Sequence, residues 1–138
     1  MIKNTYSTDL KGLPSLAKKV AKRLRGGEIL ALNGDLGSGK TAFVRALAKL
    51  LKIRGMVTSP TFVLMNVFPA RLPTNRKPII LFHLDLYRIK KISDVKALGL
   101  TQLWGQKNTV SVIEWADKIK KHLPKNTWRI NFFHEKST

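Results

Sequence analysis

The chain has 138 residues, of which 43% are hydrophobic and 25% charged, and it contains no cysteine. These values fit one globular core, and they exclude a disordered chain, a disulfide framework and a zinc–cysteine site. Lysine and arginine total 26 against 8 acidic residues, a formal net charge of +18. Such a charge attracts polyanions such as RNA, DNA, anionic lipid or an acidic protein, although residues dispersed along a sequence also serve solubility alone.

The apolar segments are too short to span a bilayer, and the first six residues lack the apolar stretch of a secretory signal. We therefore expect a protein of the cytoplasm with no membrane association. No repeat, low-complexity tract or linker divides the sequence, so we expect a single domain over residues 1–138, with 134–138 as a flexible tail.

The first half of the chain alternates between helical and extended patterns. Four-residue spacing of apolar side chains predicts a helix that two glycines end, and an apolar run then predicts a buried strand. A glycine-rich turn and a second amphipathic helix follow. These elements are Pro14–Arg25 with Gly26 and Gly27, Glu28–Asn33, Gly34–Gly39 and Thr41–Leu51.

The middle of the chain begins with a second extended segment. Ser59 and Pro60 open it, because proline suits the start or edge of a strand, and it runs through Phe68. Three prolines and three basic residues predict an exposed loop over Pro69–Pro78. Ile79–Phe82 is then a buried strand that leads to Asp85.

The last third contains a short helix and two strands. Ser93–Leu98 is predicted as the helix, with Ser93 as its N-cap and Gly99 at its end. Thr109–Ile113 is an apolar strand that delivers Glu114, and Thr127–Phe133 is a final strand expected to be antiparallel. The alternation of strands and helices predicts the α/β class, with the site at the strand ends.

A complete phosphate-binding motif lies between the first strand and the second helix. Gly34-Asp35-Leu36-Gly37-Ser38-Gly39-Lys40-Thr41 matches G-x4-G-K-[ST], and Ala42 extends the expected nucleotide-binding segment. Glycines let backbone N–H groups converge on phosphates, Lys40 supplies a charge for the β- and γ-phosphates, and Thr41 supplies a hydroxyl for Mg²⁺. The motif predicts a nucleotide with Mg²⁺, and the missing Asn-Lys-x-Asp motif disfavours guanine without proving adenine. We expect a P-loop NTPase-like, three-layer α/β/α fold with a mainly parallel but mixed central sheet.

Two carboxylates end apolar strands. Asp85 has the position of the metal-side aspartate of a P-loop nucleotidase, and Glu114 fits the Mg²⁺ shell or the orientation of the attacking water. We thus predict Lys40, Asp85 and Glu114 as catalytic residues, and Thr41, Asp85 and Glu114 as metal-side residues. The structural alternatives are a turn cap for Asp85 and a surface partner of a lysine for Glu114.

Three further features have two interpretations each. Ser59, Pro60 and Thr61 form either a switch that senses the γ-phosphate or an ordinary strand entry. His83, inside an apolar strand, is interpreted as a packed core side chain in preference to a base. Trp115 either covers the site or a partner groove, or packs in the core.

Five motifs together resemble the TsaE (YjeE-type) family. They are the glycine loop, Ser59-Pro60-Thr61-Phe62, His83-Leu84-Asp85-Leu86-Tyr87-Arg88, Leu98-Gly99-Leu100 and Glu114-Trp115. The resemblance implies a P-loop ATPase for threonylcarbamoyladenosine at position 37 of tRNAs that read ANN codons, with slow hydrolysis and TsaB and TsaD as partners. It also makes Asp85 a Walker-B-like acid, with tRNA contacted indirectly or through the basic surface.

The sequence departs from the family pattern in places. Lys90, Lys91 and Lys96 replace much of an acidic stretch, Leu13 stands where a threonine is common, and Ala42 replaces a threonine. Two other functions remain open at this point, a small-molecule P-loop kinase and a basic RNA-binding module in which the nucleotide is structural.

Overall fold

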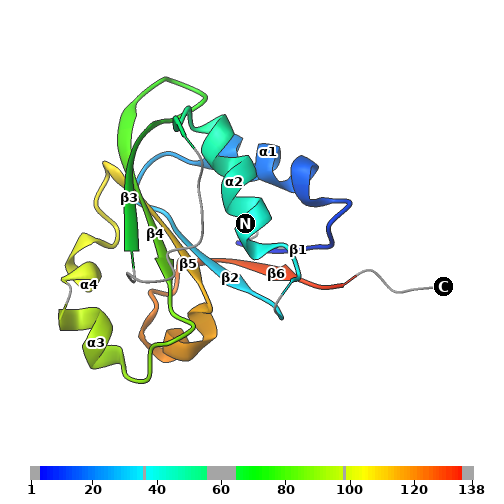
Figure 1. Ribbon diagram of the computed structural model, residues 1–138. Helices are drawn as coiled ribbons and strands as arrows, with labels where there is room; N and C mark the ends of the chain where they lie inside the picture. The colour runs from blue at the N-terminus through cyan, green and yellow to red at the C-terminus, as the bar shows by residue number, and fades with distance from the viewer. Residues whose placement is uncertain (1–3, 36, 56–64, 98, 135–138) are drawn as a thin grey trace.

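The computed structural model describes residues 4–35, 37–55, 65–97 and 99–134 (Figure 1). Strands and helices alternate along most of the chain. The strands are β1 (Thr5–Thr8), β2 (Ile29–Asn33), β3 (Met65–Arg71), β4 (Pro78–Asp85), β5 (Thr109–Glu114) and β6 (Trp128–Phe132). The helices are α1 (Leu13–Arg23), α2 (Lys40–Leu50), α3 (Ile92–Ala97), α4 (Leu100–Leu103) and the 3-10 helix η1 (Ala116–His122).

All six strands lie in one sheet, in the order β1-β6-β2-β5-β4-β3. Every neighbouring pair is parallel except β3 and β4, which pair antiparallel at one edge. The register places Leu32 opposite Glu114, and Asp85 opposite Glu114. The ends of β2, β5 and β4 therefore meet at the carboxyl-terminal edge of the sheet.

The central strands are apolar on both faces because helices cover both faces. On β2, Leu30 and Leu32 pack in one buried cluster with α1 and α2, whereas Ile29 and Ala31 pack in a second cluster with α3 and η1. Figure 1 shows α1 and α2 side by side, away from α3 and α4. The result is the three-layer, mixed-sheet α/β fold that the sequence predicts.

The final strand is parallel, so the prediction of an antiparallel strand is wrong. β6 lies between β1 and β2 and runs in the same direction as both. The segment 115–127, with η1 in it, provides the crossover connection that a parallel neighbour needs. The strand β1 was not predicted, since four residues with alternating burial give too short a pattern.

The loop predicted over Pro69–Pro78 is shorter in the structure. β3 continues through Pro69 and Ala70 to Arg71, which pair with Ile80, Ile79 and Pro78. An edge strand tolerates proline because one side of its backbone has no neighbour to bond. The two strands thus form a hairpin whose connection is 72–77.

The short helices differ from their predictions in detail. α3 begins at Ile92, so Ser93 lies inside the first turn and is not the N-cap. Gly99 does end the helix, with φ 72° and an N–H that donates to the Lys96 carbonyl at 2.9 Å. The helices α4 and η1 were not predicted, because they are short and have no cap signal. Within the described ranges, no helix has both the length and the apolar character needed to cross a membrane.

Candidate nucleotide-binding site

The glycine-rich turn between β2 and α2 has a backbone that side chains would obstruct. Gly37 and Gly39 have φ angles of 77° and 111°, in the region that favours glycine. A Cβ atom on Gly34 would lie 2.6 Å from the Ser38 hydroxyl and 2.8 Å from the Phe132 carbonyl oxygen. The chain therefore needs glycine at these positions to turn from the strand into the helix.

Lys40 is the first residue of α2, and its ammonium group points back into the turn. Its Nζ donates to the carbonyl oxygen of Gly34 and, at 3.2 Å, to that of Asp35. The side chain is 5% exposed. Burial lowers the pKa of Lys40 below its ordinary 10.5, while four carboxylates oppose that shift, those of Glu114, Asp85, Asp35 and Asp117. A cation is thus held in the loop among acidic side chains.

Glu114 connects α2 to two strands. Its Oε1 accepts a hydrogen bond from the Thr41 hydroxyl at 3.1 Å, and its Oε2 lies 2.6 Å from His83 Nε2. Glu114 is 2% exposed and His83 is fully buried. Because both carboxylate oxygens have a partner, the Glu114 side chain has one orientation, toward the start of α2.

Asp85 lies beside Glu114 on the neighbouring strand. Its Oδ1 accepts the backbone N–H of Tyr87 at 3.0 Å, and the Leu86 N–H donates to the Glu114 carbonyl oxygen at 3.1 Å. The turn after β4 is thereby fixed, and the half-exposed carboxylate of Asp85 remains at the edge of the site. The turn cap and the metal-side role expected of Asp85 are compatible.

Two aromatic rings flank the lysine. Lys40 Nζ lies 3.9 Å from the centroid of the Trp115 ring, and the Trp115 and Tyr87 rings are 5.1 Å apart in a tilted contact. Trp115 has a positive φ of 59°, an uncommon conformation for a large residue. The Trp115 ring lies over the lysine of the site and also packs against the buried cluster of α3 and η1, so both of its interpretations apply.

The arrangement fits a magnesium–nucleotide complex. The first N–H groups of a helix have no intrahelical partner and bind anions, and here they follow a turn into which glycines admit a phosphate. The Ser38 hydroxyl is buried without a partner in the described residues, which leaves it a donor for a ligand. The oxygens of Thr41, Glu114 and Asp85 suit Mg²⁺, a cation that takes few protein ligands and completes its shell with phosphates and water.

The described side chains alone do not form a metal site. No group of three or more histidine, cysteine or acidic side chains within the described residues is arranged to hold a metal ion. A cation here would depend on phosphate oxygens as well as on the protein, as Mg²⁺ does in phosphoryl-transfer sites.

The structure brings most of the predicted site residues together. The loop, Lys40, Thr41, Asp85 and Glu114 share the carboxyl-terminal edge, and Ala42 is exposed in the first turn of α2. Leu36 and the switch candidates Ser59, Pro60 and Thr61 lie outside the described residues, as do Phe62, Leu98 and the tail 135–138.

His83 and Asp117 were missed as members of the site. His83 is buried as predicted, but its ring nitrogen contacts Glu114 instead of packing only on apolar neighbours. One signal in the sequence was its spacing, because His83 and Asp85 are two residues apart on one strand and therefore lie on the same face of the sheet. Asp117 comes two residues after Trp115, whose positive φ no sequence pattern predicts.

Comparisons with known proteins agree on one family. The family model described as threonylcarbamoyl adenosine biosynthesis protein TsaE matches residues 7–138. The tRNA threonylcarbamoyladenosine biosynthesis protein TsaE of Treponema pallidum is 36% identical over 113 residues, which cover 81% of this chain and 77% of that protein. The protein of the same name from Bacillus subtilis is 34% identical over 116 residues, covering 84% and 68%.

The fold comparison points the same way. The crystal structure of Bacillus subtilis YdiB matches with a TM-score of 0.65 and 26% sequence identity, over 95% of this chain and 75% of that one. The family model spans the chain almost from end to end, and the identities exceed 30% over most of its length. The chain belongs to the TsaE family.

Proposed function

We propose that this protein binds and slowly hydrolyses ATP with Mg²⁺ as an accessory factor in threonylcarbamoyladenosine modification of tRNA. The modified base is the one at position 37 of tRNAs that read ANN codons, and the partners are TsaB and TsaD. The observation that carries the proposal is the convergence of Lys40, Thr41 and Glu114 on one glycine-rich turn. The names of the relatives supply the pathway.

The residues divide the work of hydrolysis. Backbone N–H groups of the turn and the Lys40 ammonium hold the β- and γ-phosphates, while Thr41 and the carboxylates hold Mg²⁺, which supplies charge neutralisation when bound. Glu114 or Asp85 orients a water molecule in line with the γ-phosphorus. The water oxygen forms a bond to phosphorus and loses a proton to a phosphate oxygen, while the bond to the bridging oxygen breaks and its electron pair leaves with ADP. ADP and inorganic phosphate are then released.

We expect slow turnover by the lone chain because neither arginine near the motifs is marked by them as a group that holds the γ-phosphate. Arg45 lies in α2 after the loop, and Arg88 follows β4, and both side chains are exposed. An arginine that stabilises the transition state must be held against the γ-phosphate, and this contribution amounts to roughly 10³–10⁵ in rate. We therefore assign completion of the site to a partner protein.

A docking surface for that partner surrounds the site. Three large apolar side chains are about half exposed and each follows a strand at the carboxyl-terminal edge: Leu10 after β1 (56%), Tyr87 after β4 (50%) and Phe133 after β6 (51%). Leu10 also lies beside the glycine turn, since a Cβ on Gly39 would be 3.0 Å from its Cδ2. Exposed apolar groups around a site support binding of a protein there.

The test is the steady-state ATPase rate of the chain alone and with TsaB–TsaD. We expect slow turnover alone and acceleration of at least tenfold by the partners, since a completed site gains orders of magnitude. Fast turnover by the lone chain, or no response to the partners, contradicts the proposal. Phosphorylation of a small molecule in a metabolite panel would favour the kinase alternative.

A further inference from the structure

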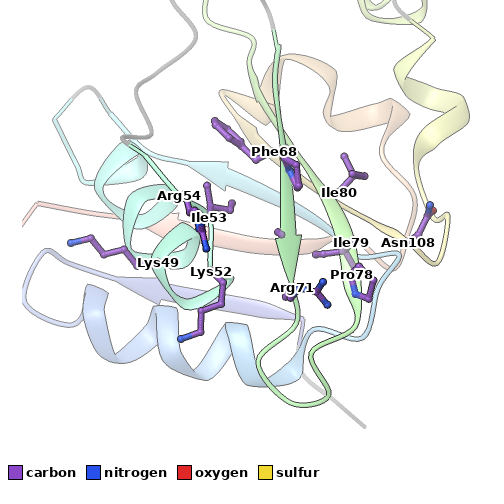
Figure 2. Close-up of a pocket in the computed structure, with 12 residues that line it drawn as sticks. Lys49, Lys52, Ile53, Arg54, Phe68, Arg71, Pro78, Ile79, Ile80 and Asn108 are labelled. Carbon is purple, nitrogen blue, oxygen red and sulfur yellow. The ribbon is translucent and has the colours of Figure 1, made fainter.

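A basic groove lies at the opposite end of α2 from the glycine-rich turn. It has a volume of about 990 Å³ and lies between the end of α2 and the β3–β4 hairpin (Figure 2). Apolar side chains form its floor, among them Ile53, Phe68 and Ile79. The cations around it are Lys49, Lys52, Arg54 and Arg71, all with exposed side chains.

Hydrogen bonds hold the two walls of the basic groove together. The backbone N–H of Arg71, at the end of β3, donates to the Leu51 carbonyl oxygen at 2.9 Å. The Ile53 N–H donates to the Ala48 carbonyl oxygen at 3.0 Å, which closes the end of α2. The groove is therefore formed by main-chain bonds and not by the chance positions of long side chains.

None of the described residues that line the groove carries a carboxylate. Within the described residues, its four cations form no ion pair, and the Arg71 guanidinium donates to the Arg76 carbonyl oxygen at 3.0 Å. Glu28 precedes β2 at the same edge of the sheet, but it accepts the backbone N–H groups of Arg25 and Gly26 and does not line the groove. The positive charge of the groove is thus left for an external anion.

The basic groove is separate from the nucleotide site. Lys40 and Lys49 belong to the first and last turns of α2, whose 11 residues span about 16 Å. Pro78 and Asn108, which line the groove, lie at or before the starts of β4 and β5, whereas Asp85 and Glu114 end those strands. An anion in the groove therefore does not compete with a nucleotide.

We propose that the basic groove binds the sugar–phosphate backbone of RNA. Cations distributed around a cavity of this size suit several phosphates in succession, whereas one free phosphate would use a small part of it. The half-buried Phe68 ring on the floor offers a face for a base, a combination typical of sequence-tolerant RNA sites. The choice of RNA over DNA, and of tRNA in particular, rests on the proposed function.

The test compares two variants that each lose three positive charges. The groove variant is Lys49→Gln/Lys52→Gln/Arg54→Gln, and the control is Lys120→Gln/Lys121→Gln/Lys125→Gln, whose exposed lysines lie in and after η1. Binding of a fluorescent, unmodified tRNA transcript is measured by anisotropy between about 50 and about 200 mM salt. Thermal unfolding and circular dichroism of each variant check that the fold is retained.

We expect the groove variant to bind the transcript at least about tenfold more weakly, with a salt slope smaller by about 2, since each phosphate contact contributes about 0.7. The control should stay within about twofold of wild type. Equal binding by the groove variant and wild type, or equal weakening of both variants, overturns the proposal. So does a groove variant that keeps RNA affinity and loses TsaB–TsaD, because the occupant is then an acidic protein.

Calorimetry with Mg-ATP on the wild-type chain keeps the two proposals distinct. If the chain binds no ATP but the groove variant loses RNA, the proposed ATPase function fails and the RNA site stands. If ATP binds and RNA affinity does not depend on the groove, the RNA site fails and the proposed nucleotide site stands.

Discussion

The carboxyl-terminal edge of the sheet gathers carboxylates around one buried lysine, whereas the amino-terminal edge gathers exposed lysines and arginines around an apolar floor. Four of the eight acidic residues act on Lys40. In contrast, no acidic residue is among the described side chains that line the basic groove. Helix α2 joins the two regions, with Lys40 in its first turn and Lys49 in its last.

The difference between the two edges shows that the net charge of +18 is not spread evenly over the molecule. The acidic residues concentrate at the edge where the proposed magnesium–phosphate complex would need oxygen ligands, and the apolar Tyr87 and Phe133 lie at that edge. The cations of the basic groove lie at the other edge, where a polyanion suits them. In our proposals, one end of the molecule serves chemistry and assembly, and the other binds RNA.

The largest effect is expected at the lysine of the nucleotide site. Lys40→Ala should weaken Mg-ATP binding about 100-fold or more, since each hydrogen bond from a charged donor contributes about 1.5–3 kcal/mol. Isothermal titration calorimetry measures the change. The control Lys18→Ala removes the same charge from the exposed surface of α1 and should leave ATP affinity as in wild type. Equal affinities for Lys40→Ala and wild type would remove the assignment of the loop to phosphates.

The carboxylates should affect turnover more than binding. Glu114→Gln and Asp85→Asn are each expected to lower the partner-stimulated hydrolysis rate about 100-fold while ATP stays bound, because they act on the metal and the water. A single-turnover assay with TsaB–TsaD separates the two steps. Asp94→Asn, an exposed change on α3, is the matched control. Normal hydrolysis by both site variants would show that these groups are structural.

The buried histidine should have a smaller effect, because it acts through Glu114. His83→Leu removes the partner of Glu114 Oε2 and should lower kcat about tenfold with little change in KM for ATP. His83→Gln keeps a donor near the position of Nε2, so it should recover much of the rate. If both substitutions reduce the rate equally, His83 matters only for packing.

The smallest effect is a pH dependence. Because burial lowers the pKa of Lys40, its ammonium loses the proton at a pH below 10.5 in the free protein. ATP affinity should therefore fall severalfold as the pH rises through the lowered pKa of Lys40. At lower pH, where the lysine is charged, the affinity should be constant. Calorimetry across the alkaline range tests the sign, and a rising affinity would contradict it. Lys40→Arg, which stays charged, should show a flatter profile.

The convergence of Lys40, Asp85 and Glu114 could be predicted from the sequence because each residue is marked by a pattern in its own segment. The glycine turn and Lys40 are contiguous, and Asp85 and Glu114 can be recognised as single charges at the ends of apolar runs. His83 could not be assigned, since the sequence does not tell which strand lies beside β4. Only the parallel pairing of β4 with β5 brings its ring to Glu114.

The basic groove could not be predicted because its cations come from two separate segments. Lys49 is in the last turn of α2, Lys52 and Arg54 follow that helix, and Arg71 comes from a strand that the proline-rich pattern had marked as loop. The direction of β6 was predicted wrongly for a related reason. A short alternating strand fits either direction until its neighbours are known.

The central claim is tested most directly by multiple-turnover formation of threonylcarbamoyladenosine on an unmodified tRNA, with TsaB–TsaD, the threonylcarbamoyl donor and Mg-ATP supplied. We predict that the wild-type chain sustains repeated rounds, and that Glu114→Gln, which still binds ATP, supports no more than the first. Equal product formation with wild type, with Glu114→Gln and without this chain would contradict the account.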